Sequence, residues 1–72
     1  MRLIESVADS PFSFIAARDM AVNAIFQAAD EGGWELAWNQ AHEFSGRFNE
    51  GLEGWVFRHS IRVPIIYPGE GV

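Results

Sequence analysis

Cysteine and lysine are both absent from this 72-residue chain. Without cysteine, neither a disulfide nor a thiolate-ligated metal ion can stabilise so short a sequence. Chains below about 70–80 residues rarely bury enough apolar surface alone, and they commonly rely on disulfides, metals or additional subunits. The missing cysteines therefore favour association with other chains as the source of added stability.

Basic residues are scarce as well. Five arginines stand against ten acidic residues, which gives a net charge of −5 and a pI near 4.7. Nucleic acids and anionic membranes are usually bound through basic patches, so neither is expected as a direct partner. No apolar run approaches the roughly 18–20 residues of a membrane span. The first residues also lack the apolar core of a signal peptide, so we expect a protein of the cytoplasm, of a cell or of a host cell.

Apolar residues, in contrast, are plentiful. They make up 49% of the chain, with three tryptophans, six phenylalanines and one tyrosine. This content argues against disorder and predicts one small domain spanning residues 1–72. Its last five residues, 68–72, have the composition of a frayed tail.

The last third of the chain is one extended run, residues 54–67, with no turn signal before Pro68. Its large apolar residues recur at every second position, which places them on one face of a strand. A strand this long needs hydrogen-bond partners along its backbone, and a short chain has little left to supply them. We therefore expect a second subunit to complete the sheet by strand pairing across a two-fold axis. Pro64 is expected at an edge, at a bulge or at a break in the run.

Residues 2–7 are compatible with a short strand, and residues 12–31 with a helix. Ser10 followed by Pro11 is a helix-start signal, and Gly32-Gly33 supplies the end. Alanines recur along one side of this helix, where they would permit close approach of another backbone. An alternative interpretation makes residues 12–16 a second strand, with the helix beginning near Arg18-Asp19.

Residues 34–48 predict a second amphipathic helix, because their apolar residues recur at spacings of three and four. The alternation in residues 34–38 leaves a β-meander as the alternative. The predicted fold is therefore α+β, with two helices packed on a small antiparallel sheet that includes the long C-terminal strand. The apolar positions of the second helix are Trp34, Ala37, Trp38, Ala41, Phe44 and Phe48.

No motif indicates catalysis. His42 and His59 lack the helical spacing of a metal pair, and the expected role of His59 is a core or interface residue with one hydrogen bond. The serines lack a nucleophile context, and the glycines form no phosphate loop. We expect no catalytic residue, no cofactor and no metal site.

The candidate binding residues are charged or aromatic. Arg58 and Arg62 share a strand face, as a clamp for carboxylate or phosphate groups or as a solvated face paired with acids such as Glu5 or Glu53. Trp55 is a candidate interface anchor, because tryptophan is enriched at binding hot spots. An acidic group around Gly32-Gly33 suits a partner with a basic surface, or serves as ordinary solvated surface. Its members are Asp30, Glu31 and Glu35.

These features favour a non-catalytic protein-binding module that occludes a partner surface as an inhibitor or adaptor. Phage and mobile-element antagonists of host machinery, such as anti-CRISPR proteins, share this size and composition. One alternative is a structural or assembly subunit of an oligomer, with a homodimer as the simplest case. A second alternative is a small histidine-dependent enzyme that binds a metal or ligand through His42, His59 and nearby acids.

Overall fold

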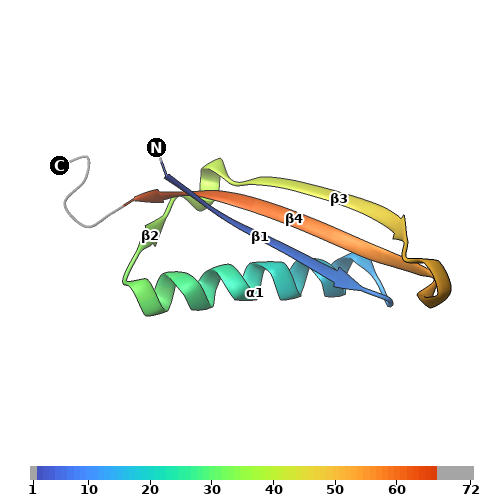
Figure 1. The fold of residues 1–72 in the computed structure, drawn as a ribbon. Helices are drawn as coiled ribbons and strands as arrows, with labels where there is room; N and C mark the ends of the chain where they lie inside the picture. Colours follow the sequence, from blue (N-terminus) through green and yellow to red (C-terminus); the bar gives the residue numbers. More distant parts are fainter. Residues whose placement is uncertain (1, 67–72) are drawn as a thin grey trace.

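The structure is a computed structural model, and it describes residues 2–66. The predicted tail, 68–72, lies outside these residues. The elements, in chain order, are β1 (Arg2–Ser10), α1 (Phe14–Gly32), β2 (Glu35–Leu36), the 3-10 turn η1 (Trp38–Gln40), β3 (His42–Asn49), the 3-10 turn η2 (Gly51–Glu53) and β4 (Trp55–Ile66) (Figure 1). The molecule is elongated, at 50 × 20 × 17 Å.

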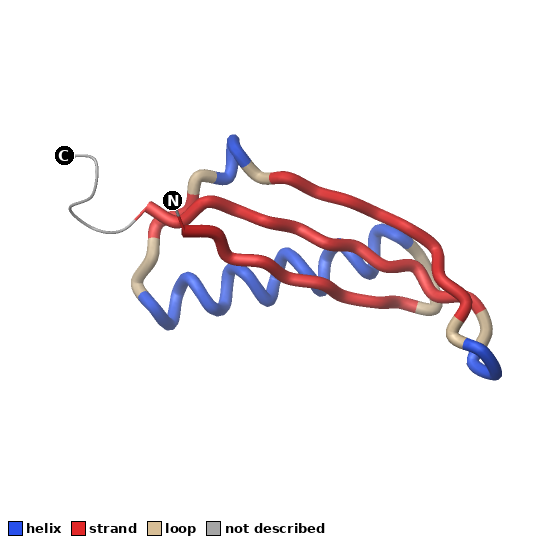
Figure 2. The backbone as a smooth tube through the Cα atoms, turned by 45° about the horizontal axis from the view of Figure 1, so that its top comes forward, coloured by secondary structure: helices blue, strands red, loops and turns tan. Residues whose placement is uncertain are grey.

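The long strand β4 lies in the middle of the sheet (Figure 2). Along one edge it pairs antiparallel with β1, from Arg2 opposite Ile65 to Ser10 opposite Phe57. Along the other edge it pairs first with β2 and then with β3, both antiparallel. The backbone of β4 therefore finds neighbours on both sides within its own chain, and the prediction that a second subunit must pair with this strand is wrong.

The predicted second helix is also wrong. Residues 34–48 form β2, η1 and β3, so the fold has one helix and a four-stranded antiparallel sheet, with 48% of the described residues in strands. The spacing of three and four was misleading, because Phe44, Gly46 and Phe48 also alternate as strand residues do. Gly46 is unfavourable in a helix interior. An extended segment can also form backbone hydrogen bonds with the otherwise unpaired edge of β4, which a helix cannot do. The β-meander alternative is the nearer description.

Helix α1 begins at Phe14, two residues later than expected. Ser13 is its N-cap and accepts a hydrogen bond from the Ala16 N–H at 3.0 Å, which satisfies one of the helix's unpaired donors. Ser10 ends β1 instead, and its hydroxyl accepts from the Phe12 N–H at 3.0 Å. Gly33 closes the helix in the left-handed conformation, with φ of 66°, as the glycine pair predicted. The alternative strand over residues 12–16 is not formed.

The alanine side of α1 faces the sheet. Ala17, Ala21 and Ile25 are fully buried, and Ala21 and Ile25 pack against Ile61 and Val63 of β4. Small side chains on the helix let its backbone lie close to the strands, so the core is thin. The larger apolar side chains are left outside this core, including Phe12, Ile15, Met20, Phe26, Phe44 and Trp55.

Pro64 lies within the central strand, at the gap between the β2 and β3 pairings. Its carbonyl accepts from the Ala37 N–H at 2.9 Å, so its missing N–H faces the corner where η1 leads from β2 to β3. A ladder hydrogen bond is therefore not lost there, which explains how a proline is tolerated in the middle of a sheet.

Candidate functional site

The sheet has one covered face and one uncovered face. Helix α1 packs over β1 and β4 on a single side (Figure 1). Side chains alternate along a strand, so the even-numbered residues 56–62 of β4 point to the other side of the sheet. The residues opposite them in β1 and β3 point to the same side. We call this surface the open face. It comprises Leu3, Glu5, Val7 and Asp9 of β1, Val56, Arg58, Ser60 and Arg62 of β4, and His42, Phe44, Gly46 and Phe48 of β3.

Large apolar side chains are exposed on the open face. Leu3 and Val7 of β1 are about half exposed, and Phe44 of β3 is 71% exposed. The small Ser60 lies between Val7 and Phe44 in the register, so the centre of the face is low and its margins are high. Apolar side chains gathered on one side of a small protein are typical of an interaction surface.

A hollow of about 560 Å³ opens on this face. Its walls come from all three long strands, and Ser60 and Arg62 of the central strand contribute to it. This volume is within the usual range for a site that receives a ligand or a protruding side chain. The lining residues are Leu3, Glu5, His42, Glu43, Phe44, Ser60 and Arg62.

Arg58 and Arg62 lie on the open face, and each is held by acids of the same chain. Arg62 Nε lies 2.8 Å from Glu5 Oε2, which is the pairing expected for a solvated face. Arg58 donates to both carboxylate oxygens of Asp9, at 2.7 and 2.8 Å, and to Glu50 at 3.0 Å.

These hydrogen bonds fix the charge states of the pair at Arg58. The hydrogen bond from Arg58 lowers the pKa of Asp9, and the same bond raises the pKa of Arg58. The guanidinium also lies over the ring of Phe48, 4.5 Å from its centroid. The open face thus carries two arginines balanced by Glu5 and Asp9, although the whole chain is strongly acidic.

The two histidines lie on opposite faces, so they do not form an acid–base pair. His42 faces the hollow, whereas His59 is 5% exposed and lies on the helix side of β4. Glu43 Oε1 is 2.9 Å from His59 Nε2, and Ser45 Oγ is 2.6 Å from His59 Nδ1. Because a carboxylate only accepts, we assign the ring proton to Nε2, and the serine hydroxyl then donates to Nδ1.

Arg18 of the helix completes this cluster, with its Nε 2.8 Å from Glu43 Oε1. The pKa of Glu43 is lowered, chiefly by the hydrogen bond from His59 and secondarily by Arg18. The cluster joins α1, β3 and β4 and satisfies a buried imidazole, which had been expected to make one hydrogen bond. Among residues 2–66, the structure brings together no group of three or more potential metal ligands.

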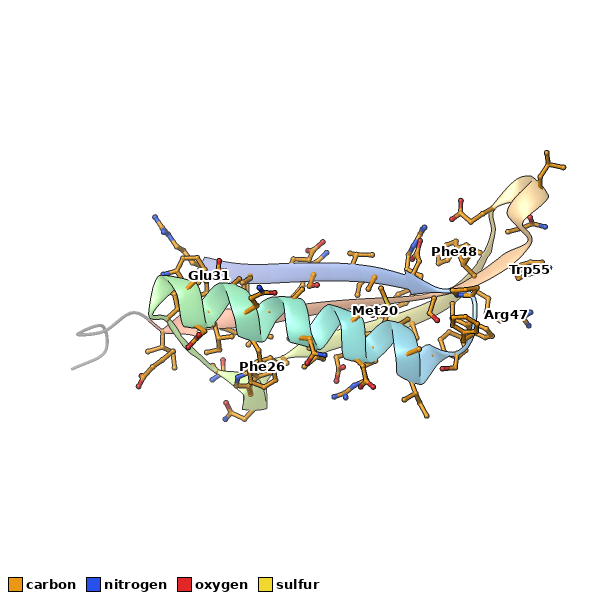
Figure 3. The ribbon with its side chains drawn as sticks, turned by 90° about the horizontal axis from the view of Figure 1, so that it is seen from below. Met20, Phe26, Glu31, Arg47, Phe48 and Trp55 are labelled. Atoms are coloured by element: carbon orange, nitrogen blue, oxygen red, sulfur yellow. The ribbon has the colours of Figure 1, made fainter. Side chains whose placement is uncertain are left out.

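The remaining predicted site residues lie at the two ends of the molecule. Trp55 is at the β3–β4 end, where the Arg47 guanidinium lies 5.2 Å from its ring centroid. Asp30, Glu31 and Glu35 lie at the other end, where α1 leads into β2. Figure 3 shows Glu31 and Trp55 at opposite ends of the molecule. The structure therefore does not gather the predicted residues into one site.

Sequence reasoning missed the apolar part of the open face. Alternation does place Leu3 and Val7 on one face of the first strand, opposite Ile4 and Ser6, but they were not proposed as binding residues. Phe44 and Phe48 were assigned to a helix, which hid their alternation. The chain matches no family model, no curated protein and no solved structure. Within the described residues, no helix is both long and apolar enough to cross a membrane.

Proposed function

We propose that this chain is a protein-binding module of the cytoplasm of a cell or host cell, and that it acts by occluding a partner surface as an inhibitor or adaptor, without catalysis of its own. The observation that carries the proposal is the hollow on the open face, bordered by exposed Leu3 and Phe44. A partner's apolar side chain entering this hollow would remove both residues from water. Burial of one such side chain contributes about 1.5–3 kcal/mol.

Charge supports the same proposal. The open face is locally balanced, so an apolar partner surface can approach it without burying an unpaired charge. The acidic excess lies elsewhere, including Asp30 and Glu31 at the end of α1. That excess would steer the module towards a partner with a basic surface and raise the association rate at low salt.

A matched pair of substitutions tests the proposal. Leu3→Asp places a charge at the rim of the hollow, whereas Met20→Asp places one on α1 at nearly equal exposure, 51% against 54%. In capture from an extract of the organism that encodes the chain, we expect a protein bound by the wild type and by Met20→Asp to bind at least about tenfold more weakly to Leu3→Asp. Equal capture by Leu3→Asp would contradict the assignment of the open face.

A further inference from the structure

The outer edge of β3 carries unpaired backbone groups. The carbonyl of Pro64 points towards the β2–β3 side of β4, and backbone direction alternates along a strand. The backbone groups of the even-numbered residues of β4 therefore form hydrogen bonds with the residues opposite them in β3. Ser60 of β4, for example, pairs with Phe44 of β3. The odd-numbered residues of β3, Glu43 to Asn49, direct their N–H and C=O groups outwards, where no described strand pairs with them.

This edge lacks most of the usual protection against further pairing, and its two charged residues, Glu43 and Arg47, are of opposite sign. Natural edge strands are kept short, carry charged side chains (lysine above all) or proline, or are covered by another element. Strand β3 has eight residues, contains neither lysine nor proline, and is exposed along most of both faces. Helix α1 covers β1 and β4 instead, so a strand can approach β3 without obstruction (Figure 2).

We propose that a second copy of this chain pairs its β3 antiparallel with this edge, about a two-fold axis at Ser45. An axis normal to the sheet keeps helix-side residues opposite helix-side residues. Glu43 then lies opposite Arg47 of the second copy, and by symmetry Arg47 lies opposite its Glu43. Both pairs fall at outward-facing positions, so each also exchanges two backbone hydrogen bonds.

The open-face side of the same register is complementary as well. Phe44 lies opposite Gly46 of the second copy, a position without a side chain. The Phe48 ring already lies over Gly46, 3.0 Å from where a β-carbon would stand. The incoming Phe44 therefore meets the Phe48 ring edge-on or offset, which is a favourable contact between aromatic residues.

Neighbouring registers lack this agreement. An axis at Phe44 places Glu43 opposite Ser45, and an axis at Gly46 places Glu43 opposite Asn49. In neither case do the charges of β3 meet. The Ser45 register is therefore selected by opposite charges in cross-strand positions, which stabilise a sheet.

Strand β1, the other edge, is a poor site for self-pairing. Axes from Ile4 to Val7 place an acid opposite a second acid or opposite Leu3. For an axis at Ile4, Glu5 lies opposite Leu3 of the second copy. For an axis at Glu5 it lies opposite Glu5 of the second copy, and for an axis at Val7 it lies opposite Asp9. Axes at Glu5 and Val7 place like charges directly opposite each other, which destabilises a sheet, and axes at Ile4 and Ser6 place an acid opposite Leu3. None of the four brings opposite charges together, so we assign the contact to β3.

The dimer extends the proposed function without depending on it. Both helices lie on one side of the joined sheet, and the two open faces continue into each other on the other side. Each copy contributes one hollow, so a partner with two protruding side chains would be held at two points. The dimer contact uses β3, whereas the test residue Leu3 lies on β1, so either idea can fail without the other.

The test is the molar mass over a wide concentration range, by sedimentation or by light scattering behind size exclusion. We expect the wild type to approach twice 8.1 kDa as concentration rises. Arg47→Glu turns two attractive pairs into two repulsive ones, and its dimer should be at least about tenfold weaker. Arg2→Glu makes the same charge change on β1 and should leave the dimer intact.

A second pair of variants tests the backbone contact. Arg47→Pro removes an outward N–H from β3, and Val7→Pro removes one from β1, so only the first should weaken the dimer. Far-UV circular dichroism establishes which variants are folded. A wild-type mass of 8.1 kDa at every concentration would overturn the proposal, as would folded Arg47→Glu and Arg47→Pro variants that dimerise as tightly as the wild type.

Discussion

At the residue scale, Arg18, Arg58 and Arg62 are each paired with acids of the same chain. Alternation alone placed Arg58 and Arg62 on one strand face, and the structure agrees. Their acidic partners could not be read from the sequence, because Asp9 stands 49 positions from Arg58 and only the strand register brings them together. The burial of His59 was likewise predictable, whereas its bond to Glu43 required β3 to be a strand.

Glu43 gives the residue-scale prediction. Glu43→Gln removes the carboxylate that accepts from both His59 and Arg18, and replaces it with a neutral amide. We expect the free energy of unfolding at pH 7 to fall by about 1 kcal/mol, since the group is partly exposed and solvent screens its charge. Urea unfolding measures this. Glu31→Gln, near the C-terminus of α1, should be neutral or slightly stabilising, and equal stabilities for the two variants would remove the role assigned to Glu43.

At the scale of elements, β1, α1 and β4 could be predicted, because local signals define each of them. Gly32-Gly33 marks the end of the helix, and period-two alternation marks both strands. The start of the helix was predicted from Ser10-Pro11, whereas the observed N-cap is Ser13. Residues 34–48 could not be predicted, since their apolar spacing fits a helix and a strand alike. The free edge of β4 decides between the two, and such pairing is a tertiary effect that local propensity does not contain.

The close packing of α1 on the sheet gives the prediction for this scale. Ala21 is fully buried against the core, whereas Ala24, on the same helix, is exposed. Ala21→Leu should lower the free energy of unfolding by about 1–3 kcal/mol, because the added atoms force the helix away from the strands. Ala24→Leu should change it by less than about 0.5 kcal/mol. Chemical denaturation of both variants decides, and an Ala21→Leu protein as stable as the wild type would mean that the helix–sheet contact is loose.

At the scale of the whole molecule, the protein is a two-layer structure with a thin core and a large apolar exterior. The aromatic content correctly indicated a folded domain, yet most of the large aromatic side chains are outside the core. Sequence alone could not show this, because aromatics serve cores and interfaces equally well. Charge is also unevenly distributed: positive and negative side chains are balanced on the open face, whereas the chain as a whole is acidic.

Acid stability is the prediction that belongs to the whole molecule. The pKa values of Asp9 and Glu43 are lowered in the folded state by hydrogen bonds from Arg58 and His59, respectively. Their contributions to stability are therefore fully present above the pKa values of the unfolded chain, and are lost as the pH falls through the lower pKa values of the folded state. Urea midpoints between pH 7 and pH 3 should fall accordingly. The Asp9→Asn/Glu43→Gln variant should show a shallower fall, and an unchanged slope would contradict these assignments.

The placement of α1 over β1 and β4 has a consequence for the dynamics of the sheet. Strand β3 is held by hydrogen bonds to β4 along one edge, and most of its side chains are in water on both faces. Local opening is least costly where few apolar contacts must be broken, so in the monomer we expect β3 amides to exchange with solvent before those of β1. We therefore expect β3 to open locally, once the bonds of Glu43 and Ser45 are broken, while α1, β1 and β4 stay folded. A partner that binds Phe44 together with Leu3 binds only when β3 is paired with β4. Its binding therefore stabilises β3 against local opening.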